Sequence, residues 1–196
     1  MNVLEGQIEY QVIIFTPRHT ISGELSLKDK RLSDHINERV DTMLVLRNVT
    51  IARLEDPARS LYKMQTAVIP KAGVVLVFEP PQKAIPPSNR FFGYTRKEKY
   101  DVFLILDGME VRGVLHTQGN LDFRRVLVNS PDAFLPITQA TVVMEANREL
   151  IVRQDAILVN TQRIRFIGQM ISSSPTQPRR SEPQQSSSSA KTDAGS

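Results

Sequence analysis

Most hydrophobic segments of this chain have the pattern of β-strands. Tyr10–Phe15 and Tyr100–Leu106 are apolar at nearly every position, so we expect central strands that are covered on both faces. In Ile21–Leu27 apolar residues alternate with Ser and Glu, which indicates a strand with one buried face. Gly23 lies inside that strand, where a glycine usually marks a bulge or a sharp bend. The Asp-Gly pair that begins at Asp107 predicts a tight hairpin turn.

The same pattern occurs twice along the chain. Tyr10–Leu25 aligns without a gap on Tyr100–Leu115, with identical Tyr, Val, Gly and Leu at four matching positions. Two further pairs of segments match in the same order and at nearly the same spacing: Met43–Ile51 with Phe134–Val142, and Ala67–Phe78 with Ala156–Ile167. Generic β patterning is the alternative explanation, but three ordered matches favour an internal duplication.

Each copy is interpreted as two strands, a short helix and two or three further strands, in the order ββαβββ. The first helix has the polar residue Ser33 near its N-cap, and Leu32, Ile36 and Val40 share one helical face. The second helix begins near Asp122. The later strands are expected over Met43–Arg53, Tyr62–Phe78, Phe134–Met144 and Leu150–Gly168. This order predicts a mainly β fold in which each copy is a partly open barrel or roll.

The chain divides into four segments. We expect a first β repeat over 1–79, a Pro-rich connector with basic and aromatic residues over 80–99, a second repeat over 100–171, and a disordered tail rich in Ser, Pro and Gln over 172–196. A repeat of about 75 residues buries barely enough apolar surface to offset chain entropy. The two repeats are therefore expected to dock on each other or on a second copy of the chain.

Three short stretches carry a resemblance to a known family. Phe15–Arg18, Ile21–Leu27 and Arg31–Asn37 contain a Phe-Thr-Pro-Arg, Ile-x-Gly-x-Leu and Arg-Leu-Ser-Asp…Asn pattern that resembles an uncharacterised bacterial domain family, a domain of unknown function. The resemblance implies an architecture and no activity. More distantly, Val102–Leu115 and Arg163–Ile167 are similar to Sm-like and SH3-like small barrels. The Asp-x-x-x-Asn base-binding pattern of the Sm-like proteins is missing, so this similarity implies no RNA-binding residue.

Composition and charge exclude several classes of protein. The chain has 196 residues, of which 40% are hydrophobic, and a net charge of +4, values that exclude a wholly disordered chain. The small basic excess is too weak to indicate a dedicated nucleic-acid-binding surface. No apolar run reaches the length of a membrane-spanning helix, and no signal peptide is visible, so we expect a cytoplasmic protein without membrane insertion.

Residues for catalysis are sparse. The chain has no Cys, which excludes disulfides, thiolate zinc sites and Cys nucleophiles. His19, His35 and His116 share no metal-ligand spacing, and the motifs of nucleophile elbows, P-loops and dinucleotide-binding folds are missing. We therefore expect a protein that is not an enzyme and that needs no cofactor or metal.

Two clusters could bind an anionic ligand. In the connector, basic and aromatic residues interleave, as in sites where bases stack on rings and phosphates meet cations: Arg90, Phe91, Phe92, Tyr94, Arg96 and Lys97. Alternatively, these rings anchor the connector against the repeats. A second set lies at the two predicted helices and could form a basic groove: Lys28, Lys30, Arg31 and Arg39 with Arg124 and Arg125. Alternatively, these cations are solvated and paired with neighbouring carboxylates.

The leading functional hypothesis is a binding or scaffold module for protein–protein interaction or regulation, with edge strands and the connector as contact surface. Its partner would be another protein or a second copy of the chain. The alternative is binding of RNA or another anionic ligand through the two basic clusters. An enzyme is the third and weakest hypothesis.

Overall fold

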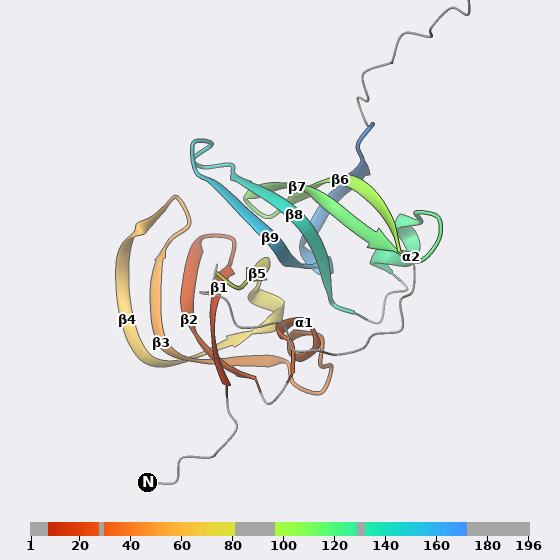
Figure 1. Cartoon of the computed structure of the whole chain (residues 1–196). Helices are drawn as coiled ribbons and strands as arrows, with labels where there is room; N and C mark the ends of the chain where they lie inside the picture. Colours follow the sequence, from red (N-terminus) through yellow and green to blue (C-terminus); the bar gives the residue numbers. More distant parts are fainter. Residues whose placement is uncertain (1–7, 28–29, 81–96, 129–131, 172–196) are drawn as a thin grey trace, which may run out of the picture.

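The structure is a computed structural model that describes residues 8–27, 30–80, 97–128 and 132–171. Within these residues, ten strands form one antiparallel sheet accompanied by two short helices (Figure 1). The first half, residues 8–80, contains β1 (Ile8–Phe15), β2 (His19–Leu27), α1 (Leu32–Ile36), β3 (Met43–Arg53), β4 (Asp56–Pro70) and β5 (Leu76–Phe78). The second half, residues 97–171, contains β6 (Glu98–Leu106), β7 (Met109–Thr117), α2 (Phe123–Leu127), β8 (Phe134–Met144), β9 (Ile151–Asn160) and β10 (Ile164–Gln169).

The two halves have the same order of strands. In the first half the order across the sheet is β5-β1-β2-β3-β4, and in the second half it is β10-β6-β7-β8-β9. A 3₁₀ turn precedes the last strand of each half, at Lys71–Gly73 and at Thr161–Arg163. β5 and β9 pair with each other and join the halves into one sheet. β4 and β10 are therefore the outer edges of the sheet, as Figure 1 shows for β4.

The bulge predicted at Gly23 is present, and Gly113 has the same bulge in the second half. Pairing of β2 with β3 shifts opposite Gly23, and pairing of β7 with β8 shifts opposite Gly113. The facing strands have residues with positive φ, Asn48 at 49° and Gln139 at 51°. A Cβ on Gly113 would lie 2.5 Å from Cγ2 of Ile137, so the strands approach too closely for a larger residue.

The last predicted match between the halves is wrong by one residue. The sequence alignment places Ala67 on Ala156. In the structure Ala67 faces Leu46, whereas Ile157 faces Ile137, the residue that matches Leu46. Ala67 therefore corresponds to Ile157. The register of strand pairing determines which residues of the two halves correspond. The identity of Ala67 and Ala156 in the sequence alignment is a coincidence.

Strand boundaries agree with the sequence pattern for β3 and β8, and the two-residue turn Asp107-Gly108 is present, with a φ of 79° at the glycine. The segment expected over Tyr62–Phe78 contains two strands. Its first strand, β4, starts earlier, at Asp56. Pro57, the second residue of β4, is tolerated there because β4 is an edge strand.

The first helix is shorter than predicted. It ends at Ile36, so Leu32 and Ile36 are buried but Val40 is fully exposed. Arg31 is the N-cap in place of Ser33, and no side chain caps that end. In the second helix the prediction is confirmed, because Asp122 accepts hydrogen bonds from the first backbone N–H groups of α2.

Each hydrophobic core contains side chains from both halves. The core around β6–β9 includes Phe15, Leu76 and Phe78 of the first half, and the core around β1–β3 includes Phe134 and Leu158 of the second. This confirms the expectation that the halves dock on each other. Most of the predicted connector and the whole predicted tail lie outside the described residues. No helix in the described part of the chain is both long and apolar enough to span a bilayer.

Candidate functional site

The internal joint is the name we give to the contact between β5 and β9, where the edge strands of the two halves pair. Leu76 pairs with Val159, and Val77 pairs with Leu158. All four side chains are buried. The backbone N–H of Asn160 continues the ladder and donates to the carbonyl of Val75 at 3.0 Å. A short strand thus gains both backbone pairing and a place in the neighbouring core.

Two asparagines strengthen the internal joint. The Asn37 side chain pairs with the backbone of Phe134: its amide donates to the Phe134 carbonyl at 3.1 Å, and its oxygen accepts from the Phe134 N–H at 2.8 Å. The buried side chain of Asn160 donates to the carbonyls of Val74 at 2.9 Å and Lys71 at 3.2 Å. These side chains satisfy backbone groups across the two halves: Asn37 bonds to the start of β8, and Asn160 bonds to carbonyls just before β5.

A groove beside the internal joint is lined by Asn37, Met43, Lys71, Phe134 and Asn160, among others. Burial of Lys71 lowers the pKa of its ammonium group. Its Nζ donates to two carbonyls at the end of α1, those of His35 at 3.2 Å and Glu38 at 3.0 Å. The polar side chains Asn37, Lys71 and Asn160 are thus bonded to backbone groups rather than free to bind a ligand. Asn37 and Asn160 link the two halves, whereas Lys71 links the 3₁₀ turn to the end of α1.

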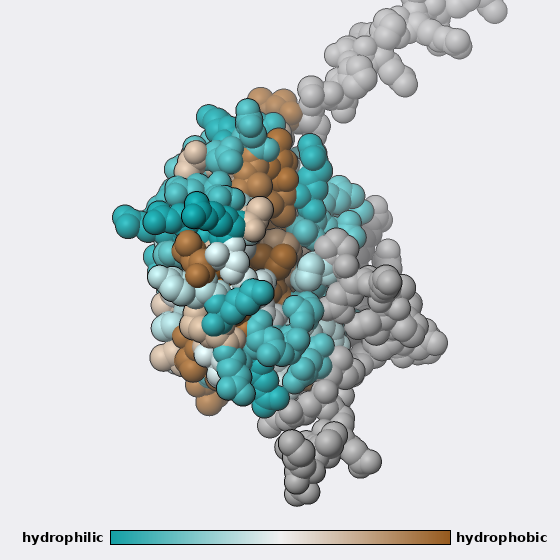
Figure 2. Space-filling view, turned by 90° about the vertical axis from the view of Figure 1, so that its left-hand side faces the viewer, coloured by the Kyte–Doolittle hydropathy of each residue, from teal (hydrophilic) through white to brown (hydrophobic). Residues whose placement is uncertain are grey.

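The outer edge formed by β4 carries exposed hydrophobic side chains. The strand is 15 residues long, and nearly all of it is exposed. Its large exposed apolar residues are Leu61, Tyr62, Met64 and Val68. This side of the molecule faces the viewer in Figure 2, where brown hydrophobic patches lie between teal hydrophilic side chains. A long edge with apolar side chains can accept another strand.

The other outer edge, β10, also carries an exposed hydrophobic side chain, beside the exposed Arg165 and Gln169. Phe166 is exposed and lies 6.4 Å, ring centre to ring centre, from Phe103 on the neighbouring strand. Asp107 holds the start of β10 by pairing with Arg165 at 2.7 Å and with Arg163 at 3.3 Å. The bond from Arg165 keeps the pKa of the Asp107 carboxyl below its ordinary value. This pairing fixes the approach of β10 to β6.

The predicted basic clusters are only partly within the described residues. Arg90, Phe91, Phe92, Tyr94, Arg96 and Lys28 lie outside them. Lys97 is exposed just before β6, and Arg31 occupies the N-cap position of α1 without a capping bond from its side chain. Arg124 and Arg125 are exposed on α2.

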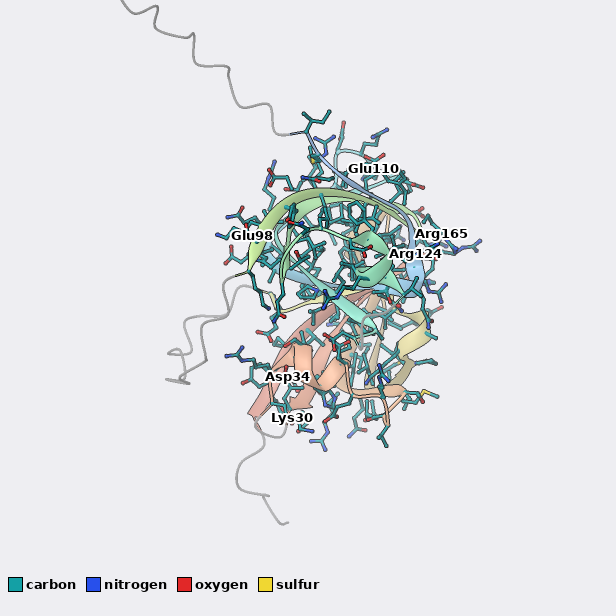
Figure 3. The ribbon with its side chains drawn as sticks, turned by 90° about the vertical axis from the view of Figure 1, so that its right-hand side faces the viewer. Lys30, Asp34, Glu98, Glu110, Arg124 and Arg165 are labelled. Carbon is teal, nitrogen blue, oxygen red and sulfur yellow. The ribbon has the colours of Figure 1, made fainter. Side chains whose placement is uncertain are left out.

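The structure does not bring the basic groups of the two helices together. Lys30 forms an ion pair with Glu38 beside α1. Figure 3 shows Lys30 with Asp34 in the lower part of the molecule and Arg124 in the upper part. The predicted basic groove between the helices would therefore need residues that the described part of the chain does not place next to each other.

The histidines are spread over the fold. Burial lowers the pKa of His35 and of His116, and Nε2 of His116 lies 2.7 Å from the hydroxyl of Thr138. His19 begins β2. Among the described residues no group of three His, Asp or Glu side chains is placed to hold a metal ion.

The sequence pattern includes Asn37 in the Arg31–Asn37 motif and predicts edge strands as a contact surface, but it assigns no role to Asn37 or Asn160 in joining the halves and does not identify β4 and β10 as the edges. Asn37 and Asn160 act on residues distant in the chain, and no local pattern marks such contacts. For the β4 edge a signal was present: in Tyr62–Pro70 both alternating faces contain apolar residues, which an edge strand with one buried face does not need. Comparison with known proteins adds no assignment, because no family model, no curated protein and no solved structure matches this chain.

Proposed function

We propose that this protein is a non-catalytic scaffold module that binds protein partners by strand addition at the free edge of β4. The observation that carries the proposal is the length and apolar character of this edge. Segment 66–70 at its end holds no charged residue, and Val68 is exposed there. Proteins usually protect such an edge with charges, prolines or a covering element. On β4 the charged residues Asp56, Arg59 and Lys63 all precede this segment, and Pro70 is its last residue.

Strand addition uses two kinds of contact. The unpaired backbone N–H and C=O groups of the edge bond to an extended segment of the partner, which gives affinity without regard to sequence. Alternate side chains along β4 then contact the partner and give specificity. The internal joint supports this proposal, because β9 already accepts the short strand β5 in this way.

The proposed architecture behind this function is a tandem of two small barrel-like units that arose by duplication. The matching strand orders, the matching bulges and the identical buried pairs Val12 with Val102 and Leu25 with Leu115 support it. Each half has two edge strands, which are its fourth and its fifth strand along the chain. The internal joint uses β9 and β5, so β4 and β10 remain outside.

The experiment is a quantitative capture from the native host with three immobilised full-length chains: the wild type, Val68→Lys and the control Ile151→Lys. Ile151 is an exposed aliphatic residue at the start of β9, so its substitution adds the same charge on a strand that lies inside the sheet and is not an outer edge. Proteins retained by the wild type and the control, and lost with Val68→Lys, support the proposal. Equal retention by all three chains contradicts it.

Binding of RNA or another anion remains the second proposal from the sequence, through Lys97, Arg31, Arg124 and Arg125 with the connector residues. The geometry favours protein binding, because the basic groups beside α1 and α2 that Figure 3 labels lie apart. A salt titration separates the two functions. Binding carried by phosphate contacts weakens steeply with added salt, whereas strand addition at an apolar edge does not.

A further inference from the structure

We infer that copies of this chain join head to tail, with β4 of one copy pairing with β10 of the next in the way that β9 pairs with β5 inside the chain. This inference rests on the proposed function, because it names the partner of the same edge. The partner strand belongs to a second copy of the chain.

The order of strands provides the first argument. Within each half, the fourth strand along the chain is β4 or β9, and the fifth is β5 or β10. The internal joint uses the fourth strand of the second half and the fifth strand of the first half. The remaining fourth and fifth strands, β4 and β10, are the two outer edges. One chain therefore presents both sides of a joint that it already forms once.

The exposure of matching residues provides the second argument. In the internal joint, Leu158 is 7% exposed and Leu76 is 0% exposed. The residues in the same positions of the ladders at the outer edges are Val68 and Phe166. Val68 is 59% exposed and Phe166 is 51% exposed. Side chains that are buried where the joint is made are thus apolar and exposed where it is open.

The internal joint predicts the register of the outer one. Val159 pairs with Leu76 and Leu158 pairs with Val77, so Ile69 is expected to face Phe166 of the next copy and Val68 to face its Ile167. Leu76 packs in the core of the second half and Leu158 in the core of the first, so each strand enters the core of its neighbour. Val68 and Phe166 would do the same between copies.

A second pair of matching positions agrees. In the internal joint Asn37 contacts Phe134. The corresponding positions at the open joint are Val128, just after α2, and Met43, at the start of β3. Both are exposed hydrophobic residues. The contact of the Asn37 side chain with the backbone of Phe134 is replaced at the open joint by two apolar side chains, which a joint between copies would bring together.

The outer joint lacks some bonds of the internal one. Pro70 stands where the internal joint has Asn160, so neither the backbone N–H nor the side-chain amide of that residue is available. Arg163 donates from its Nε to the carbonyl of Ala72 in the internal joint. The corresponding residue in the first half is Gly73, which has no side chain to make this bond. The joint between copies should therefore be weaker than the internal joint, and assembly should depend on concentration.

Because β4 and β10 are different surfaces, this contact is heterologous, and its repetition gives a closed ring or an open filament. The test uses two full-length variants, Val68→Lys, which blocks the β4 side, and Phe166→Lys, which blocks the β10 side. Sedimentation velocity measures their mass alone and mixed, with Ile151→Lys as control, and circular dichroism confirms that each variant is folded.

We expect oligomers for the wild type and the control, and single chains for each edge variant alone. The equimolar mixture should give a dimer, because one intact β10 can meet one intact β4 and both remaining edges are blocked. A wild type that stays a single chain at about 100 µM, where a joint of micromolar affinity forms, overturns the inference.

Two other results also overturn it. If Phe166→Lys still dimerises and Val68→Lys does not, two β4 edges pair symmetrically. If the wild type is a single chain but captures host proteins through Val68, the proposed function stands and self-assembly fails.

Discussion

Replacing Asn37 with Ala tests how the internal joint is held. Phe134 is buried, and its backbone N–H and C=O are both bonded to the Asn37 side chain, at 2.8 and 3.1 Å. The variant leaves both groups without these partners. Each unpaired buried group costs about 1–3 kcal/mol. Because some water can reach the half-buried site of Asn37, we expect a loss of about 2–4 kcal/mol in the free energy of unfolding.

The assay is urea unfolding followed by circular dichroism. With a slope of about 2 kcal/mol per molar urea, the expected loss lowers the midpoint by about 1–2 M. The control is Asn147→Ala, which removes two bonds at an exposed site: the 3.4 Å bond to the carbonyl of Glu55 and the 3.2 Å bond that its oxygen accepts from the N–H of Glu149. Because water can replace both bonds, the substitution should change the free energy by less than about 1 kcal/mol. Equal effects of the two substitutions would refute the role assigned to Asn37.

Two further predictions concern the packing and the pH dependence of the fold. Gly113→Ala should lower the free energy of unfolding by about 1–3 kcal/mol, since its Cβ meets Ile137 and the Thr138 carbonyl, whereas Gly73→Ala, with open space around it, should not destabilise; thermal melts of both variants check this. Burial keeps the pKa of His116 below its ordinary value of 6.5, so its contribution is complete above about pH 6.5 and is lost as the pH falls through the lower folded value. The free energy of unfolding should therefore fall from about pH 7 to about pH 5, and His116→Gln should flatten that slope; a steeper slope in the variant would contradict the prediction.

The sequence predicted the local elements of the fold well, because the alternation of side chains along a strand and the residues of a tight turn are visible within a few neighbouring residues. The alternation in Ile21–Leu27 and the glycine within it were enough to predict a bulged strand, and the second half repeats the signal. The docking of two β-rich halves was expected from the repeated sequence pattern and from the small size of each half.

Contacts between distant residues could not be predicted in this way. The first helix ends at Ile36, and the next residue, Asn37, bonds to the backbone N–H and C=O of Phe134, 97 residues further along the chain. No property of the sequence near Val40 signals that contact, so the apolar spacing extended the predicted helix too far.

Edge strands were expected as a contact surface, but which strands form the edges could not be predicted, for a related reason. Val68 and Leu158 have the same place in their strands, and their sequences do not say which strand lies inside the sheet. Only the pairing of β9 with β5 distinguishes them. The basic and aromatic residues could be proposed as a binding site from their residue types alone. Which strand is an edge depends on the arrangement of all ten described strands.

A cysteine pairing experiment tests the head-to-tail contact most directly. The natural chain has no Cys, so Val68→Cys and Ile167→Cys each introduce a single thiol. Residues directly opposite each other in an antiparallel pair have Cβ atoms about 4.5–5.5 Å apart, near enough for a disulfide after a small adjustment. When the two full-length variants are mixed and mildly oxidised, mass spectrometry should find the mixed disulfide in excess over either symmetric one, and Ile151→Cys should not form it. Symmetric Val68→Cys dimers in excess, or no disulfide beyond the level of the control, would contradict the account.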